Sequence, residues 1–212
     1  MKIRIPALIG PEEAIRLQEK MAPLVSEESK LPANLVTLVG CDATYVTETT
    51  LAAATLVDYD ELKLVKVSTV TEKTRFPYIA GLLAFREAPS VLRAIQCLKA
   101  KSYVCLVDAH GRAHPRKFGL ACFVGLALDQ PTIGVAKNLL YGRISGNIVV
   151  DKQGESLAAI IRLPDSEKTI YVSVGHKISL RDAVKIVEHC LTRDGPLPIK
   201  LDMKRCQEGN GC

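Results

Sequence analysis

Tryptophan is absent from this sequence of 212 residues, and aromatic residues make up only 5% of it. Because 48% of the residues are hydrophobic, a sizeable core is still expected, and its side chains must be mostly aliphatic. No run of about 18 apolar residues occurs, so a membrane-spanning helix is not expected. The amino terminus also lacks the pattern of a secretory signal peptide. We therefore expect a cytoplasmic protein with no membrane partner.

Closely spaced cysteine pairs are missing as well. The chain has seven cysteines, and no two of them form a Cys-x-x-Cys pair. Several of them, including Cys41, Cys105 and Cys122, lie in apolar runs, where a free thiol behaves as a small hydrophobic group. This usage predicts a reducing compartment and excludes both a zinc ribbon and a disulfide framework.

The charge balance and the length define the class of protein only broadly. The formal net charge of +5 permits a polyanionic partner but does not require one. The length suits one α/β domain, and the sequence has no repeats and no linker. We expect a single domain over residues 1–212 with a short polar tail from about residue 203. Nothing indicates a coiled coil, and we expect a monomer.

Hydrophobic patterning predicts a mixed α/β fold. The first three strands are joined by short turns, which favours antiparallel pairing, and the later strand–helix–strand segments favour parallel pairing through right-handed crossovers. A Ser179–Asp182 pair is typical of a helix start. In chain order, the expected elements are a helix over 11–24, strands over 34–46 and 50–73 (a hairpin turning near 60–61), a helix over 90–101, a strand over 103–107, a helix over 120–128, strands over 131–136, 146–150, 157–163 and 169–175, and a last helix ending near 193.

Three acidic residues stand at element boundaries or inside a strand. Asp108 follows the strand 103–107, which is apolar without alternation and therefore buried on both faces, and sites form beyond the carboxyl ends of such strands. Asp42 interrupts a strand, where aspartate is disfavoured, and Glu87 stands at a predicted helix start. A Mg²⁺ site needs such oxygen ligands on rigid elements. The simpler alternatives are a helix cap or a partner for Arg112 at Asp108, and a first-turn acid at Glu87.

A basic run follows Asp108 directly. Arg112, Arg116 and Lys117 lie within nine residues of this acid. Cations beside a carboxylate cluster suit a phosphate backbone that lies across the cluster. A solvated loop is the ordinary alternative for such a charge run.

Five blocks of the sequence carry a family resemblance: "DATY", "FPYIAGLLAFRE", "DAHGRAHPRKFGLA", "PTIGVAKNLLYG" and "YVSVGHKISL". They resemble the signature blocks of the endonuclease V family of nucleases, which act on deaminated adenine (inosine). The resemblance extends in the family's order from about Asp42 to Leu180 and implies an RNase H-like fold, an α/β mixed sheet with three antiparallel strands followed by parallel ones, flanked by helices.

The resemblance also implies an activity. It predicts a Mg²⁺-dependent nuclease, with Mn²⁺ as a substitute, that nicks DNA at the second phosphodiester bond 3′ to deoxyinosine and leaves a 3′-hydroxyl and a 5′-phosphate. The alternative within the family is an inosine-specific ribonuclease acting on single-stranded RNA. The compact chain favours DNA.

The family's site residues transfer by motif. The metal ligands are expected to be Asp42, Glu87 and Asp108, with Asp202 as a further ligand after a one-residue gap in the match. Lys137 is expected to stabilise charge on the phosphate. His114 is expected to orient phosphate or carry a proton.

A second set of residues is implied for substrate binding. "PYIA" matches the family's wedge, a loop that enters the duplex where the lesion base leaves the stack, and the Tyr78 ring is expected to fill the vacated space. The extruded base is expected in a small pocket beside this loop. The expected substrate-binding residues are Pro77, Tyr78, Ile79, Gly81, Leu83, Ala109, Gly111, Arg116 and Leu140.

The sequence departs from the family pattern at the wedge and after the catalytic acid. Ala80 replaces the second proline of the wedge, which removes one restraint on the φ angle. Ala109 and His110 stand where the family usually has D-G-x-G, so the base pocket can be narrower and pH dependence can differ.

Three other classes compete with this interpretation. Another RNase H-like nuclease, such as a junction resolvase or hybrid nuclease, would not need the wedge block. A non-catalytic inosine-binding protein would not need three acids facing phosphate. A small-molecule hydrolase using His110 or His114 as base has no supporting nucleophile elbow or zinc-ligand spacing.

Overall fold

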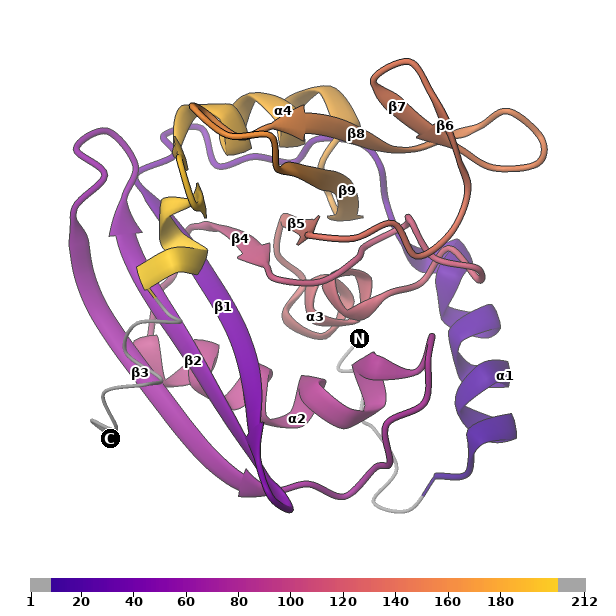
Figure 1. Cartoon of the computed structure of the whole chain (residues 1–212). Helices are drawn as coiled ribbons and strands as arrows, with labels where there is room; N and C mark the ends of the chain where they lie inside the picture. The colour runs from indigo at the N-terminus through magenta and orange to yellow at the C-terminus, as the bar shows by residue number, and fades with distance from the viewer. Residues whose placement is uncertain (1–8, 202–212) are drawn as a thin grey trace.

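A mixed sheet forms the centre of the protein, whose computed structural model describes residues 9–201 (Figure 1). Within this range the sheet has nine strands, in the spatial order β3-β2-β1-β4-β5-β9-β8-β7-β6. The strands are β1 (Thr37–Val46), β2 (Thr49–Asp58), β3 (Leu64–Lys73), β4 (Val104–Val107), β5 (Thr132–Ala136), β6 (Arg143–Ser145), β7 (Ile148–Val150), β8 (Ser156–Arg162) and β9 (Thr169–His176). The polar tail expected from about residue 203 lies outside the described residues.

The first three strands form the antiparallel meander that the sequence predicted. β1 pairs with β2 and β2 pairs with β3, both antiparallel. The predicted turn between β2 and β3 is confirmed, because Asp58 Oδ1 accepts hydrogen bonds from the backbone N–H groups of Asp60 and Glu61. An aspartate that binds the backbone two and three residues ahead is a common way to close such a turn.

Parallel pairing in the centre of the sheet is also confirmed. β4 lies parallel to β1 on one side and to β5 on the other. Beyond β5 the sheet continues differently from the expected parallel arrangement, since β9, β8, β7 and β6 all join it antiparallel. β6 was not predicted, because all three of its side chains are exposed and carry no hydrophobic pattern.

Four α-helices flank the sheet: α1 (Pro11–Met21), α2 (Leu83–Leu98), α3 (Leu120–Leu128) and α4 (Leu180–His189). The bounds predicted for α3 are confirmed, and Ser179 Oγ caps α4 by accepting from the Asp182 N–H. The prediction for α2 was wrong at its start. The helix begins at Leu83 rather than near Ser90 and carries Pro89 in its interior, where proline is disfavoured.

The end of α4 also differs from the prediction. The helix ends at His189 rather than near Arg193, since the chain turns back in a two-stranded hairpin of β10 (Leu191–Thr192) and β11 (Gly195–Pro196). Residues 197–201 then form a helical turn. None of the helices in residues 9–201 is long and apolar enough to cross a membrane.

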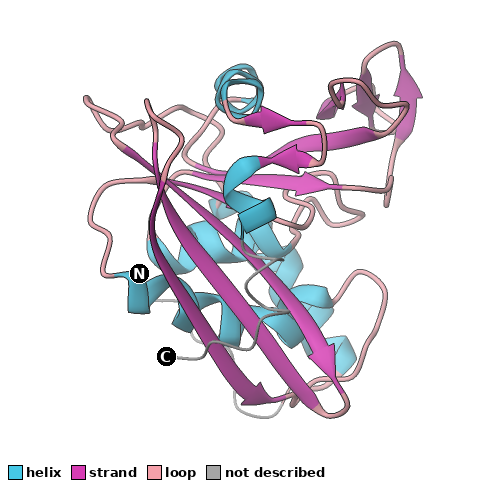
Figure 2. Cartoon of the chain, turned by 60° about the vertical axis from the view of Figure 1, so that its left-hand side comes forward, coloured by secondary structure: helices cyan, strands magenta, loops and turns pink. Residues whose placement is uncertain are grey.

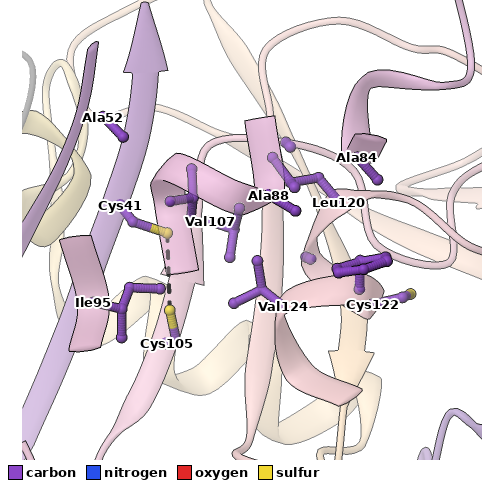
Figure 3. Packing of buried hydrophobic residues seen from close by; sticks show 14 of the residues in the cluster. Cys41, Ala52, Ala84, Ala88, Ile95, Cys105, Val107, Leu120, Cys122 and Val124 are labelled. Atoms are coloured by element: carbon purple, nitrogen blue, oxygen red, sulfur yellow. Dashed lines mark hydrogen bonds between the residues drawn. The ribbon is translucent and has the colours of Figure 1, made fainter. Parts of the chain in front are cut away.

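Helices lie against the sheet (Figure 2), and the two main hydrophobic cores fill its two faces. α2 and α3 cover one face, where Val39 and Cys41 of β1 point, while Leu38 belongs to the core beneath α4 on the other face. Figure 3 shows part of the first core, in which Cys41 Sγ and Cys105 Sγ are 3.9 Å apart. Both cores are mainly aliphatic, as the composition predicted. Because side chains alternate along β1, Asp42, which follows Cys41, lies on the opposite face of the sheet from Cys41.

Candidate active site

Two aspartates meet at the ends of the paired central strands. Cys41 of β1 lies in register with Val107 of β4, so the residues that follow, Asp42 and Asp108, are neighbours. The Asp108 backbone N–H donates to the Cys41 carbonyl at 3.0 Å and continues this ladder by one residue. Rigid strands on both sides therefore hold the two carboxylates beside each other, as the sequence indicated.

The third acid, Glu87, comes from α2 and is buried. The Tyr45 hydroxyl of β1 donates a hydrogen bond to Glu87 Oε1, and the Arg86 guanidinium lies 4.1 Å from the centre of the Tyr45 ring. Burial raises the pKa of Glu87 to about 7, the hydrogen bond from Tyr45 opposes this rise, and the charges of Asp42 and Asp108 add to it. Glu87 thus belongs electrostatically to the same group as the two aspartates.

Lys137 follows β5 and completes the charged group. Its Nζ lies 2.5 Å from Asp108 Oδ2, and its side chain is half exposed whereas that of Asp108 is nearly buried. Burial lowers the pKa of Lys137, but the hydrogen bond and charge of Asp108, with the charge of Asp42, raise it above its ordinary value. For Asp42, burial and then the charge of Asp108 raise the pKa well above its usual range. The lysine offsets only part of the repulsion among the acids.

The donor set fits a hard divalent cation. The charge of Asp108 raises the pKa of both Asp42 and Glu87, and such a group of acids is unfavourable without a cation. Carboxylate oxygens are the ligands that Mg²⁺ and Mn²⁺ prefer. Within residues 9–201, however, no three acidic, histidine or cysteine side chains are grouped closely enough to hold a metal ion as they stand. Asp202, the further ligand expected from the sequence, lies outside the described residues.

A cavity of about 340 Å³ opens beside Asp108 and Lys137. Of the expected substrate-binding residues, Pro77, Gly111 and Arg116 are not in its lining. Gly111 lies under β9, where an added Cβ would come within 2.1 Å of the Val174 carbonyl oxygen. The expected residues that do line the cavity are Tyr78, Ile79, Gly81, Leu83, Ala109, Leu140, Asp108, His114 and Lys137.

The exposed wedge segment forms one side of this cavity. Tyr78 is 72% exposed, the highest value among the large hydrophobic residues found exposed, and Pro77 and Ala80 beside it are exposed too. Gly81 has a φ of +79°, which glycine adopts without strain. An aromatic ring is therefore presented to solvent at the mouth of a cavity.

Three side chains converge on the Gly81 carbonyl oxygen behind this segment. It accepts from His114 Nε2 at 2.9 Å, from Arg116 Nη2 at 2.8 Å and from Gln18 Nε2 at 3.1 Å. His114 Nδ1 accepts from the Arg116 backbone N–H at 3.2 Å. Both ring nitrogens of the buried His114 are therefore engaged within the protein.

Gln18 was not predicted as a site residue, since hydrophobic periodicity assigns the buried face of a helix to its apolar residues. The buried residues of α1 are instead Ala14, Gln18 and Met21, a helical spacing of four and three. A glutamine on this stripe was the available signal.

A second cavity, of about 520 Å³, is also lined by Asp108 and Lys137 and was not predicted. Lys168 and Lys200 line it with Glu167 and Asp194. Its cations come from the β8–β9 loop and from the helical turn 197–201, which are distant in the sequence. The Asp108–Lys137 pair thus borders both cavities: the cavity of about 340 Å³ beside the Tyr78 segment, called the wedge-side cavity below, and the second cavity with its charged walls.

Ala109 and His110, the two departures that the sequence shows after Asp108, both line the cavity of about 340 Å³. Ala109 is buried, and burial lowers the pKa of His110. The Nδ1 atom of His110 is buried, and no hydrogen bond to it is found in the described part of the chain.

Comparison with known proteins identifies the family. A family model described as Endonuclease V matches residues 19–203, which is most of the chain. The chain belongs to the endonuclease V family. Endonuclease V of Thermofilum pendens is 40% identical over 199 residues, covering 92% of this chain and 86% of that protein. The RNase H-like fold and the resemblance expected from the sequence are confirmed.

Solved endonuclease V structures superpose over almost the whole chain. The Streptomyces avermitilis protein is 30% identical, with a TM-score of 0.85, and the match covers 98% of this chain and 97% of that one. The Ciona intestinalis protein, solved with a 24mer DNA containing an inosine followed by a ribo-adenosine, is 29% identical, with a TM-score of 0.86 and coverage of 93% and 95%. The protein is a nuclease of the endonuclease V type, a family whose enzymes depend on metal ions.

Proposed function

We propose that this endonuclease V is a Mg²⁺-dependent DNA repair enzyme that nicks the strand at the second phosphodiester bond 3′ to deoxyinosine, leaving a 3′-hydroxyl and a 5′-phosphate. The observation that carries the proposal is the position of the Asp108–Lys137 pair, which lies beside two further acids and lines a cavity of ligand size below an exposed tyrosine. The inosine-containing DNA bound by the Ciona intestinalis relative supports the choice of substrate.

The acids and the lysine have different roles at the phosphate. Asp42, Glu87 and Asp108 hold the divalent ion, with Asp202 as a proposed further ligand. When bound, Mg²⁺ or Mn²⁺ supplies Lewis-acid stabilisation of the phosphate charge and activation of the attacking water. The half-exposed ammonium of Lys137 reaches phosphate oxygens and stabilises the charge that develops on them.

The wedge-side cavity takes the lesion base. Tyr78 stacks in the space that the base leaves, with Pro77 and Ile79 beside it, because every base offers a face for aromatic stacking. Leu83, Ala109 and Leu140 form walls around the base. The engaged ring nitrogens of His114 favour a role in positioning Gly81 over direct proton transfer.

An inosine-specific ribonuclease is the second candidate. The ribo-adenosine that follows inosine in the oligonucleotide bound by the Ciona intestinalis relative favours it. The two candidates differ in whether the site requires the 2′-hydroxyl.

A nicking assay on end-labelled oligonucleotides tests both candidates. Each DNA or RNA carries one inosine or one adenine and is incubated with Mg²⁺, Mn²⁺ or EDTA. We expect a metal-dependent cut of inosine-containing DNA at the second bond 3′ to the lesion. A cut confined to RNA would establish the ribonuclease, and binding without cutting in either polymer would contradict the enzyme assignment.

Asp108→Asn is the diagnostic variant. We expect its Mg²⁺-dependent nicking to fall by at least about a hundredfold, since several kcal/mol of charge stabilisation depends on this carboxylate. Binding of inosine-containing DNA should remain measurable. Asp129→Asn is the control, because Asp129 is an exposed acid paired with Lys177 and lines neither cavity. Full activity in Asp108→Asn would remove this residue from the metal site.

A further inference from the structure

We infer that Gln18 of α1 is a positioning residue for lesion recognition, which fixes the Gly81 peptide and through it the Tyr78 segment at the mouth of the base cavity. The inference rests on the proposed function, because it names a residue that prepares the proposed base pocket. It concerns no metal ligand and no group that touches the scissile phosphate.

The Gln18 amide makes contacts with two separate parts of the chain. Its Nε2 donates to the Gly81 carbonyl at 3.1 Å and to the Phe118 carbonyl at 2.9 Å, and its Oε1 accepts from Arg116 Nε at 2.7 Å. Both N–H groups and the carbonyl of the amide are therefore used. The amide joins α1 to the wedge segment before α2 and to the loop before α3.

Burial makes these hydrogen bonds of Gln18 costly to lose. Gln18 is fully buried, and burying an amide is unfavourable unless its hydrogen bonds are made. Ala14 and Met21 on the same stripe show that apolar side chains suit this face of α1. A polar residue that is satisfied in full specifies one arrangement of its partners more narrowly than an apolar residue of the same size.

Gly81 is the point at which this arrangement matters for the cavity. Its carbonyl oxygen also receives His114 Nε2 and Arg116 Nη2, so it is held from several directions. Gly81, Gln18 and Tyr78 all line the cavity. A rotation of the Gly81 peptide would therefore change the cavity wall and the direction in which the exposed Tyr78 segment leaves it.

A prepared pocket reduces the cost of taking a base out of the stack. Base extrusion already requires unstacking, and a site whose loops must also be ordered loses further binding free energy. Loss of the Gln18 amide should therefore weaken binding of the extruded base. Contacts with phosphates, which undamaged DNA shares, should remain.

The test uses two variants of the full-length protein. Gln18→Met keeps the length of the side chain without a hydrogen-bond donor. Gln18→Glu keeps an acceptor for Arg116 Nε, but it has no donor when ionised and only one when protonated, so it cannot donate to both carbonyls. Met21→Ala is the matched control, since Met21 is buried one turn further along the same face of α1 and lines neither cavity. Thermal unfolding is measured for each, and binding is measured in EDTA well below each midpoint.

Two readouts separate positioning from simple stability. The first is the ratio of affinities for matched oligonucleotides containing inosine or adenine. The second is the fluorescence of 2-aminopurine placed next to the inosine, which increases when the neighbouring base leaves the stack. We expect Gln18→Met and Gln18→Glu to lower the affinity ratio about tenfold and to reduce the fluorescence change, since a lost buried hydrogen bond is worth about that factor. The Met21→Ala variant should be less stable but should keep both the affinity ratio and the fluorescence change of the wild type.

The outcomes distinguish the two proposals. A wild-type protein that shows neither an inosine preference nor a fluorescence change would contradict the proposed function itself. A wild-type protein that shows both, with Gln18 variants that retain them, would overturn the positioning role and leave Gln18 as a packing residue. If Gln18→Met does not fold, Gln18→Glu alone decides the question by the same two readouts.

Discussion

At the scale of single residues, His114 shows how burial selects one protonation state. Its Nδ1 accepts from the Arg116 backbone N–H, so the proton of the neutral ring lies on Nε2 and is donated to Gly81. A second proton would place an N–H against the Arg116 N–H. Burial, with the charge of Arg116, lowers the pKa of His114 to about 4.

This pKa predicts a stability difference in acid. The unfolded chain binds a proton at His114 near pH 6.5 and the folded protein only near pH 4, so between these values the unfolded state holds more protons. The stabilising contribution is complete above pH 6.5 and is lost as the pH falls towards 4. We expect this loss to reach roughly 3 kcal/mol in the wild type and to be absent in His114→Gln.

Urea unfolding at pH 4.5 and pH 7 checks the prediction. The comparison is the difference between wild type and His114→Gln, which cancels contributions from His110 and His176, whose pKa values burial also lowers. Equal pH dependence in the two proteins would show that His114 is not the group responsible.

At the scale of elements, a glycine in β1 allows the last described segment to reach the site. A Cβ at Gly40 would lie 2.3 Å from the Pro198 carbonyl oxygen, and Thr55 Oγ1 donates to that oxygen at 2.8 Å. The helical turn 197–201 therefore packs directly on β1 and β2, two residues before Asp42. It brings the charge of Lys200, which lowers the pKa of Asp42 against the larger effect of burial.

Gly40→Ala should displace this turn. We expect a loss of about 1–3 kcal/mol in the free energy of unfolding from the added bulk, and a larger loss in nicking than in binding of inosine-containing DNA. Gly10→Ala is the control, because a Cβ at Gly10 meets nothing within 4 Å. Thermal unfolding, nicking and metal-free binding are compared for the three proteins. If nicking and binding fall by the same factor, the turn 197–201 has no specific role in the cleavage step.

Elements with strong local patterns were predictable, and those set by tertiary contacts were not. β4 and α3 followed from continuous apolar runs, and Asp108 was recognisable because its strand ended on it. The predicted start of α2 was wrong. Pro89 suggests a helix boundary, but the packing of α2 against β2 and β3 stabilises the helix on both sides of this proline. Local patterns do not include that stabilisation.

The candidate site also contains residues that the sequence could predict and residues that it could not. Asp42, Glu87 and Asp108 could be assembled from motifs, and the pKa perturbations support their grouping. Gln18 depends on contacts with residues 63 and 100 positions away, and the second cavity depends on loops that meet only after folding. Their spatial relation has no short-range signal in the sequence.

At the scale of the whole molecule, two cavities share the Asp108–Lys137 pair, and the chain has a net charge of +5. The second cavity is lined by Lys168 and Lys200 as well as by Lys137. This distribution suits a strand that crosses the ion pair with its phosphates along one groove and one base in the other cavity. Affinity and selectivity then come from different parts of the surface.

Salt should therefore change affinity without changing selectivity. A fourfold rise in salt is expected to weaken binding about three- to fourfold for each phosphate contact, because counterions released on binding are the main source of affinity. The inosine-to-adenine affinity ratio should stay constant, since base contacts are uncharged. Fluorescence anisotropy at several salt concentrations measures both slopes. A ratio that falls with salt would place charge in the base pocket.

The parallel order β1-β4-β5 also has a consequence for the growing polypeptide on the ribosome. A nascent chain that has reached residue 100 contains Asp42 and Glu87, and its first three strands and α2 can form from neighbouring segments. It lacks Asp108 and Lys137, which come only with β4 and β5. An unfinished chain therefore holds two of the four residues of the proposed site, and we expect it to be unable to cut nucleic acid. Completion of the central strands is the step that assembles the proposed site.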